Sequence, residues 1–178
     1  MIGLNALFWI FVALFAVIGM TRGWAKELLV SFAVILAMFI ITVLERFVPF
    51  MRDNVVFTGG ATLFWVRFLL MLALVFFGYQ GPNIPKLAST NRFARERLQD
   101  SLLGLFLGAL NGYLVFGSIW YYLDDAGYPF GFILPPISGP IEEATARMMP
   151  LMPPYWLGTP AIYFAVAIAF AFVLVVFI

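Results

Sequence analysis

The sequence lacks both cysteine and histidine. Without cysteine, disulfides, thiolate nucleophiles, iron–sulfur clusters and thiolate zinc sites are excluded. Without histidine, the chain has neither the commonest metal ligand nor the usual proton shuttle, and an acyl-transfer triad cannot form. We therefore expect no metal, no cofactor and no enzymatic activity. A membrane enzyme that relies only on carboxylates at the outer interface is the least favoured alternative.

Charged residues are also scarce. They make up 11% of the 178 residues, whereas 64% are hydrophobic, and the mean hydropathy is +1.03. A soluble domain is about one quarter charged, so most of the surface of this chain must face lipid. Helices satisfy their backbone hydrogen bonds within one segment, as lipid requires, and the apolar runs lack the alternating pattern of a membrane barrel. The sequence predicts an all-α, polytopic transmembrane helical bundle.

Long apolar runs predict about five transmembrane spans, because a helix needs about 20 residues to cross the hydrocarbon core. The first run has no Lys or Arg before it and no small-residue cleavage pattern after it, so we expect it to be retained. The chain then divides into a four-helix membrane domain (1–123), a Pro-rich segment (124–159) and a last span (160–178). The five spans are predicted at residues 4–20, 28–48, 61–79, 102–123 and 160–178.

Basic residues between the spans predict the orientation. Lys and Arg concentrate in cytoplasmic loops, and one side of the membrane would carry six of them against three on the other. The N-terminus is therefore expected outside and the C-terminus in the cytoplasm. Residues 91–98 combine basic and apolar residues at helical spacing, which is typical of a helix lying on anionic lipid, so nucleic acid is not expected as a partner. The cytoplasmic six are Arg22, Lys26, Lys86, Arg92, Arg95 and Arg97, and the outer three are Arg46, Arg52 and Arg147.

The Pro-rich segment holds seven of the eleven prolines, which rule out one continuous helix. A short interfacial helix fits between Pro140 and Met149, since proline suits a first helical turn and acidic residues complement the positive end of the helix dipole. The segment is too apolar for a free loop, so we expect it to dock on a partner or on the membrane surface. The residues expected to make that contact are Ile141, Met148, Tyr155 and Trp156, the last two as interfacial aromatic anchors.

Three glycines of the fourth span, Gly104, Gly108 and Gly112, lie on one stripe because they recur every four residues. Such a stripe lets two helix backbones approach closely, so it indicates tight packing within the bundle or between protomers. Lining of a pore is the alternative. Asn111 beside the stripe is open to the same two interpretations, as an interhelical hydrogen bond or as a polar lining.

Arg67 is the charge embedded furthest in a predicted span. It lies about six residues, or roughly 9 Å, inside the third span. Its long side chain is able to snorkel to the membrane boundary. The alternative is a buried ion pair with an acid of the outer side, Glu45 or Asp53. An ionisable residue within a span is otherwise a candidate for function by default.

Two short motifs resemble the colicin V production (CvpA) protein family. The first, which resembles the first hairpin of the family, comprises Gly19, Arg22, Gly23 and then Glu27. The second, residues 100–112, resembles the start of the last conserved span and contains the glycine stripe and Asn111. The resemblance covers roughly residues 1–123. It implies a bacterial inner-membrane protein, connected with colicin export and envelope homeostasis and without an established biochemical activity. The Pro-rich segment and the fifth span depart from the family pattern.

Two functions remain for such a chain. We expect a structural or accessory subunit of a larger membrane complex or of an envelope or secretion system. The alternative is a homo-oligomeric channel or transporter with the glycine-striped helix along the path. Five spans without an internal repeat argue against the inverted-repeat transporter design. The expected partners are the lipid bilayer and other membrane subunits, or further copies of the chain.

Overall fold

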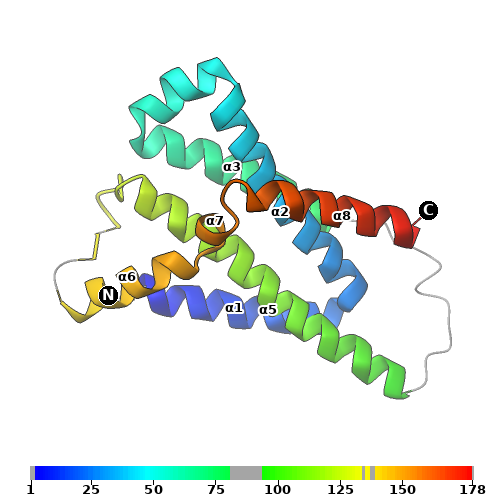
Figure 1. Ribbon diagram of the computed structural model, residues 1–178. Helices are drawn as coiled ribbons and strands as arrows, with labels where there is room; N and C mark the ends of the chain where they lie inside the picture. The colour runs from blue at the N-terminus through cyan, green and yellow to red at the C-terminus, as the bar shows by residue number, and fades with distance from the viewer. Residues whose placement is uncertain (1–2, 81–93, 134, 137–138, 178) are drawn as a thin grey trace.

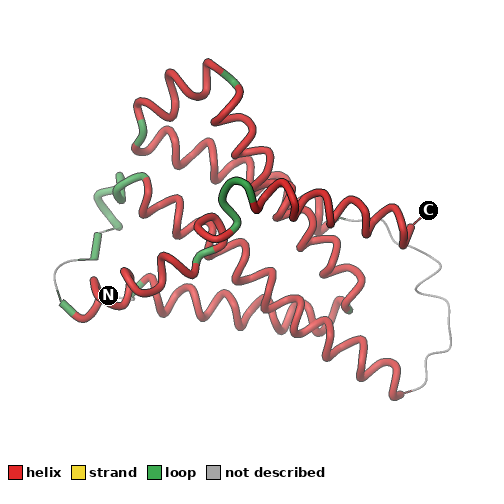
Figure 2. The backbone as a smooth tube through the Cα atoms, viewed as in Figure 1, coloured by secondary structure: helices red, strands yellow, loops and turns green. Residues whose placement is uncertain are grey.

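The computed structural model describes residues 3–80, 94–133, 135–136 and 139–177. Helices make up nearly all of these residues, and the described chain contains no strand (Figure 2). The all-α prediction is therefore confirmed. The helices are α1 (Leu4–Arg22), α2 (Trp24–Phe47), a π-helical turn (Met51–Val56), α3 (Gly60–Tyr79), α5 (Ala94–Asp125), α6 (Pro140–Met148), a 3-10 turn (Met149–Leu151), α7 (Pro153–Trp156) and α8 (Ala161–Phe177) (Figure 1).

Four of these helices are long and apolar enough to cross a membrane, namely α1, α2, α3 and the Glu96–Asp125 part of α5. The apolar part of α8, Ala161–Val175, is shorter. The polytopic bundle of about five spans agrees with this arrangement. The helix bounds differ from the predicted spans mainly at α5, which begins at Ala94 instead of 102. The basic residues after 93 therefore belong to the first turns of a long helix, whereas Lys86 and Arg92 lie outside the described residues.

Helix α2 lies at the centre of the bundle and contacts α1, α3, α5 and α8. Its buried residues follow the three- and four-residue spacing of one helix face, and they include Val30, Val34, Met38 and Ile41. Helix α1 runs along α5, and these two helices form the most extensive pair in the structure (Figure 1). Helix α3 packs on another side of α2, so the core lies where α2, α3 and α5 meet.

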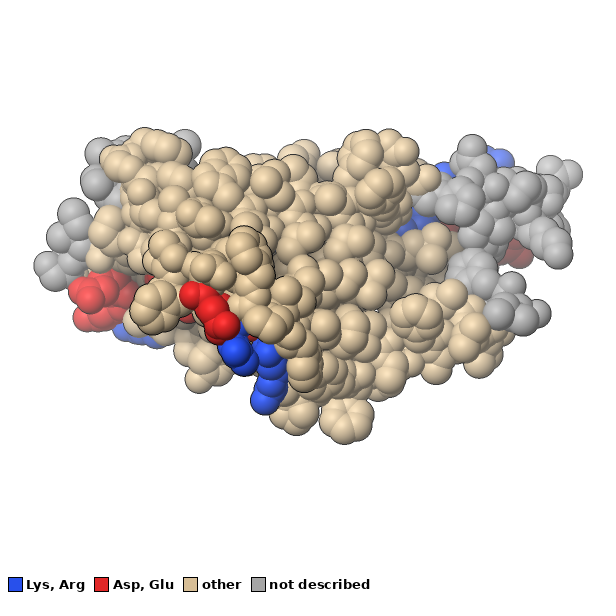
Figure 3. Space-filling model, turned by 90° about the horizontal axis from the view of Figure 1, so that it is seen from above, with Lys and Arg blue, Asp and Glu red and all other residues tan. Residues whose placement is uncertain are grey.

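Charged side chains are confined to small parts of the surface. Seen from above, most of the molecule is uncharged, and Lys, Arg, Asp and Glu gather at the two ends and in one small group between them (Figure 3). Large apolar side chains such as Trp9, Phe77 and Phe164 are exposed on the helices. A surface of this kind is stable in lipid, which needs no polar covering.

The Pro-rich segment enters the bundle instead of covering its end. The short helix predicted after Pro140 is α6, and the chain then breaks at Pro150 and Pro153 before α8 begins. The ring of Pro153 lies against Gly117, in the C-terminal third of α5. Helix α8 continues along α2 in the opposite direction, with Tyr163 against Phe39. The chain from Gly139 onwards thus follows a broken path of α6, α7 and α8 (Figure 1).

Candidate functional site

Two acidic residues mark the two ends of α2. Glu27 lies in its first turn and Glu45 near its last, 18 residues later, which is five helical turns and about 27 Å. A whole number of turns places both carboxylates on one face of the helix. Each carboxylate is at the centre of a cluster of polar side chains from neighbouring helices.

The first cluster, called here the Glu27 cluster, consists of Arg22, Glu27, Ser31 and Asn111. Glu27 and Asn111 are both fully buried. Asn111 Nδ2 donates to the Oε2 of Glu27 at 2.8 Å and to its backbone carbonyl at 2.9 Å. Ser31 Oγ donates to Asn111 Oδ1 at 2.7 Å. The amide of Asn111 thereby uses both its donor and its acceptor between α5 and α2, which is the interhelical hydrogen-bonding geometry expected of a buried amide.

Arg22 neutralises Glu27 and connects a third helix. Its Nε lies 2.8 Å from Glu27 Oε1, an ion pair by distance in which the N–H does not point directly at the oxygen. Its guanidinium carbon lies 4.4 Å from the centre of the Tyr79 ring, and Nη2 donates to the Tyr79 carbonyl at 3.3 Å. One arginine at the end of α1 therefore binds the start of α2 and the end of α3.

The predicted glycine stripe lies against α1. A Cβ on Gly104 would overlap the carbonyl oxygen of Gly19, and one on Gly108 would overlap the carbonyl oxygen of Phe15. A Cβ on Gly112 would lie 2.9 Å from the Cα of Val12. The two backbones are in direct contact along this stripe, so its closest packing is within the bundle. We call Gly19, Gly104, Gly108 and Gly112 the glycine contact.

The turn between α1 and α2 is held by α5 as well. Gly23 has a φ of 86°, a conformation that favours glycine. A Cβ there would lie 2.9 Å from a carboxylate oxygen of Asp100. The same Oδ1 accepts a hydrogen bond from the Trp24 backbone N–H at 3.2 Å, at the N-terminus of α2. Gly19, Arg22, Gly23 and Glu27 of the first motif thus contact the second motif, residues 100–112, directly or through one another.

The second cluster, the Arg67 cluster, joins α2, α3 and α5. Arg67 Nε lies 2.6 Å from Glu45 Oε1, and Nη1 lies 2.5 Å from Asp125 Oδ2. The guanidinium carbon is 5.0 Å from the centre of the Tyr122 ring. Arg67 is only 8% exposed, so it is buried with its partners instead of reaching the boundary. Of the two acids considered from the sequence, Glu45 is a partner, whereas Asp53 pairs with Arg52 at 2.8 Å.

Apolar side chains fill the space between the two clusters. Ser118, fully buried, donates to the carbonyl of Leu114 at 2.6 Å and lies 3.4 Å from the sulfur of Met38. Val34 of α2 and Val115 of α5 are buried as well, and both belong to the apolar core. Polar groups therefore follow the α2–α5 contact from one cluster to the other, but packed side chains separate them.

The residues expected to make outer contacts occupy different environments. Ile141 is 65% exposed, whereas Met148 packs beside Phe8, Trp120 and Met152. Tyr155 is 61% exposed and Trp156 49%. The indole Nε1 of Trp156 donates to the hydroxyl of Tyr113 at 2.9 Å, and that hydroxyl donates to the Leu151 carbonyl. Trp156 is therefore tied to the middle of α5.

Several contributors to these contacts have no clear sequence signal. Tyr79, Tyr113 and Ser31 are ordinary residues of apolar spans. Asp100 and Asp125 have a weak signal, because they are acids at either end of the fourth span. The described residues contain no group of three or more Asp and Glu side chains able to hold a metal ion.

Comparison with known proteins agrees with the motif contacts. The model of the colicin V production protein family matches residues 4–130, which include both motifs, both clusters and the glycine contact. No similar curated protein and no similar solved structure was found. The match ends within the Pro-rich segment, before α6. It extends over most of the chain and confirms the resemblance seen in the sequence, so this multi-pass membrane protein belongs to the colicin V production protein family.

Proposed function

We propose that this protein is a non-catalytic, structural or accessory subunit of a larger complex in the bacterial cytoplasmic membrane. One observation carries the proposal. Glu27 and Arg67, the charged side chains buried in the described part of the chain, each meet an opposite charge from a neighbouring helix. Ionisable groups that serve catalysis or transport must reach a substrate, and these two are engaged in joining helices.

The energetic effect of such pairing favours assembly. An unpaired charged residue at the centre of a membrane helix costs about 2.5–3.5 kcal/mol on insertion scales. Pairing Arg67 with two carboxylates offsets that cost only when α2, α3 and α5 are in place together. The Glu27 cluster has the same effect on α1, α2 and α5. The charges therefore specify one arrangement of helices, which is what a subunit with a fixed docking surface needs.

The docking surface follows by elimination. The glycine contact is used between α1 and α5, so it is not free to bind a second protein. The exposed side of the segment from α6 to α7 lies outside the family match and mixes apolar residues with the exposed Glu143–Arg147 ion pair. We propose this side as the partner contact. Its exposed apolar residues are Ile141, Leu151, Tyr155 and Trp156.

Site-specific photo-crosslinking in the native membrane tests the partner contact. A benzophenone amino acid at Ile141 is expected to give one discrete adduct with an unrelated membrane protein. The same probe at Phe77 of α3, which is 69% exposed, is the control and should give lipid adducts only. Extraction into nanodiscs followed by native electrophoresis and mass spectrometry should recover the same protein at fixed stoichiometry. A lone monomer without an adduct contradicts the proposal.

A channel is the second candidate, and the polar groups along the α2–α5 contact favour it. Asn111, Ser118 and Arg67 lie at successive levels of the bundle. The packed layer around Val34 and Val115 would have to open for an ion to pass. Flux through reconstituted vesicles that Ser118→Val abolishes would favour the channel, as would native extraction that yields only homo-oligomers.

The proposed orientation, with the N-terminus outside, has a direct test because the chain has no cysteine of its own. Arg147→Cys and Arg97→Cys each introduce one thiol, in α6 and in α5 respectively. A membrane-impermeant maleimide is expected to label the first in intact spheroplasts and the second only after lysis. The reverse labelling pattern would overturn the orientation.

A further inference from the structure

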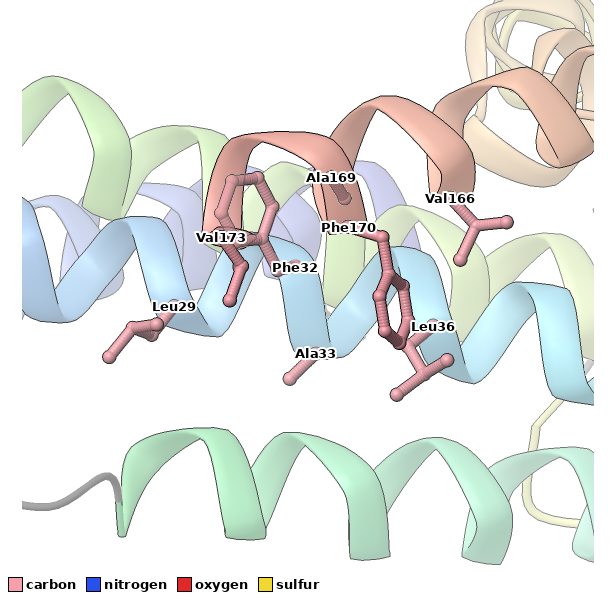
Figure 4. Close-up of a pocket in the computed structure, with 8 residues that line it drawn as sticks. All are labelled: Leu29, Phe32, Ala33, Leu36, Val166, Ala169, Phe170 and Val173. Atoms are coloured by element: carbon pink, nitrogen blue, oxygen red, sulfur yellow. The ribbon is translucent and has the colours of Figure 1, made fainter. Parts of the chain in front are cut away.

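An apolar groove of about 250 Å³ runs between α2 and α8 (Figure 4). Among the described residues, those that line it are aliphatic residues and phenylalanines, including Leu29 and Leu36 of α2 and Val166 and Val173 of α8. From Leu29 to Leu36 it extends over two turns of α2, which is about 10 Å. Such a space offers no polar partner for water, and dry apolar cavities of this size bind apolar molecules.

The groove results from how α8 meets α2. The rings of Phe32 and Phe172 are in contact, with centroids 5.5 Å apart, and those of Phe39 and Tyr163 are 6.0 Å apart. Between these two contacts, the small side chain of Ala169 on α8 leaves space that a larger side chain would fill, and Ala33 of α2 lines the groove with its Cβ turned towards Gly78 of α3 (Figure 4). Helix α8 exposes apolar side chains beside this space, including Ile168, Phe170 and Leu174, so its surroundings in the membrane are acyl chains.

A positive charge lies at one end of the groove. Lys26 is exposed one turn before Leu29, and residues 26, 29, 33 and 36 recur at the spacing of one helix side. The ion pairs of the described residues do not include Lys26. It lies near the start of α2, the end at which Trp24 begins the helix. Lysine at such a boundary attracts the phosphate of an anionic lipid headgroup.

We propose that the α2–α8 groove binds one acyl chain of an anionic phospholipid whose phosphate contacts Lys26. The acyl chain enters between Leu29 and Val173 and extends towards Leu36 and Val166, in the leaflet that adjoins the start of α2. The lipid would complete the packing between α8 and the rest of the bundle. This inference is independent of the proposed accessory function, because it concerns a surface away from α6.

Native mass spectrometry of the delipidated full-length protein tests the site. The protein is titrated with 1-palmitoyl-2-oleoyl phosphatidylglycerol or with the phosphatidylcholine that has the same acyl chains. The wild type should bind one phosphatidylglycerol at least five-fold more tightly than one phosphatidylcholine. Lys26→Glu is expected to remove that preference, and Lys26→Arg to retain it. Both variants change an exposed residue and should leave thermal unfolding unaltered.

The groove itself is tested by Val173→Phe, which fills its end beside Leu29. This variant should lose binding of both lipids by about ten-fold. Leu174→Phe, next along α8 and 52% exposed, is the matched control and should bind as the wild type does. Equal binding of both lipids in all proteins would mean that only unspecific surface lipid is present, which overturns the proposal. Cross-links between α8 helices of two copies would instead assign the groove to a second copy.

Discussion

The helices of the family-matched region pack closely against one another, whereas α8 packs loosely against α2. Between α1 and α5 the backbones touch, because Gly19, Gly104 and Gly108 have no side chains to separate them. Helix α8 contacts α2 through ring pairs that lie far apart along the two helices, Phe32–Phe172 and Phe39–Tyr163. An apolar groove remains between these contacts. Buried ion pairs add to the first arrangement, whereas α8 has no charged residue at all.

This difference shows where the stability of a membrane bundle originates. Lipid provides no hydrophobic force between helices, so close backbone packing and buried polar pairs must hold them together. The region of α1, α2, α3 and α5 has both. Helix α8 has few such contacts and gains its stability mainly by being apolar in lipid. Disruption should therefore cost much in the first region and little in the second.

The largest expected effect comes from breaking the Arg67 cluster. Arg67→Met leaves Glu45 and Asp125 without their buried cation and is expected to lower the free energy of unfolding by about 3 kcal/mol. The value is at the low end for buried pairs because the Asp125 side chain is 45% exposed. Denaturation of the purified protein in mixed micelles measures the change.

An exposed arginine of the same chain is the control for Arg67. Arg52 Nε lies 2.8 Å from Asp53 Oδ1, a distance similar to the 2.6 Å between Arg67 and Glu45. In the Arg52 pair, however, both side chains are more than half exposed. Arg52→Met should have little effect on stability, because an exposed ion pair is screened by solvent. Equal losses in the two variants would show that burial does not distinguish the two pairs.

The second prediction concerns the glycine contact. Gly104→Ala places a methyl group against the carbonyl oxygen of Gly19, which is backbone and unable to rotate away. Overpacking of this kind is expected to cost about 2 kcal/mol. Gly131→Ala makes the same chemical change at a position with open space around it and is the control. Comparison of their melting temperatures in detergent is sufficient. Equal temperatures would contradict direct backbone contact.

A third, smaller effect is expected in the Glu27 cluster. Asn111→Ala removes the hydrogen bonds that join α5 to Glu27 and Ser31, while the Arg22–Glu27 ion pair stays. Interhelical hydrogen bonds in membranes contribute about 1–2 kcal/mol or less, so we expect a loss of about 1 kcal/mol. Asn54→Ala, at an exposed amide, is the control and should have little effect. Adding Ser31→Ala to Asn111→Ala should cost almost nothing more if the two residues act as a unit.

Features tied to glycine and to apolar length were predictable from the sequence. The stripe at Gly104, Gly108 and Gly112 stands out because small residues every four positions have a specific meaning in a membrane helix. The helical class and the long spans followed from the apolar runs. Arg67 stood out as a charge among apolar neighbours, and one of its partners was among the acids considered.

The pairing of the helices was not predictable, and the physical reason is specific to membranes. In a soluble helix the polar face marks the solvent side, but in α2 the face towards the core and the face towards lipid are both apolar. Periodicity therefore could not show that Glu27 points towards Asn111 of α5 or that Glu45 points towards Arg67 of α3. The packing of the Pro-rich segment against α5 was not predictable for a related reason. Tyr113, which forms hydrogen bonds with that segment, resembles any other aromatic residue of a span.

The smallest expected effect belongs to α8. Phe172→Ala removes one of the ring contacts with α2 and should lower the free energy of unfolding by only about 0.5–1 kcal/mol. The ring of Phe11 is stacked on that of Phe116, with the two centroids 3.8 Å apart. Phe11→Ala should therefore lower the free energy of unfolding distinctly more, because it opens the contact between α1 and α5. Limited proteolysis in nanodiscs adds a second measurement, since a loosened α8 should become easier to cleave while α1 stays protected. A loss at Phe172 as large as that at Phe11 would mean that α8 is held as firmly as the family-matched helices, and the contrast between the two regions would fail.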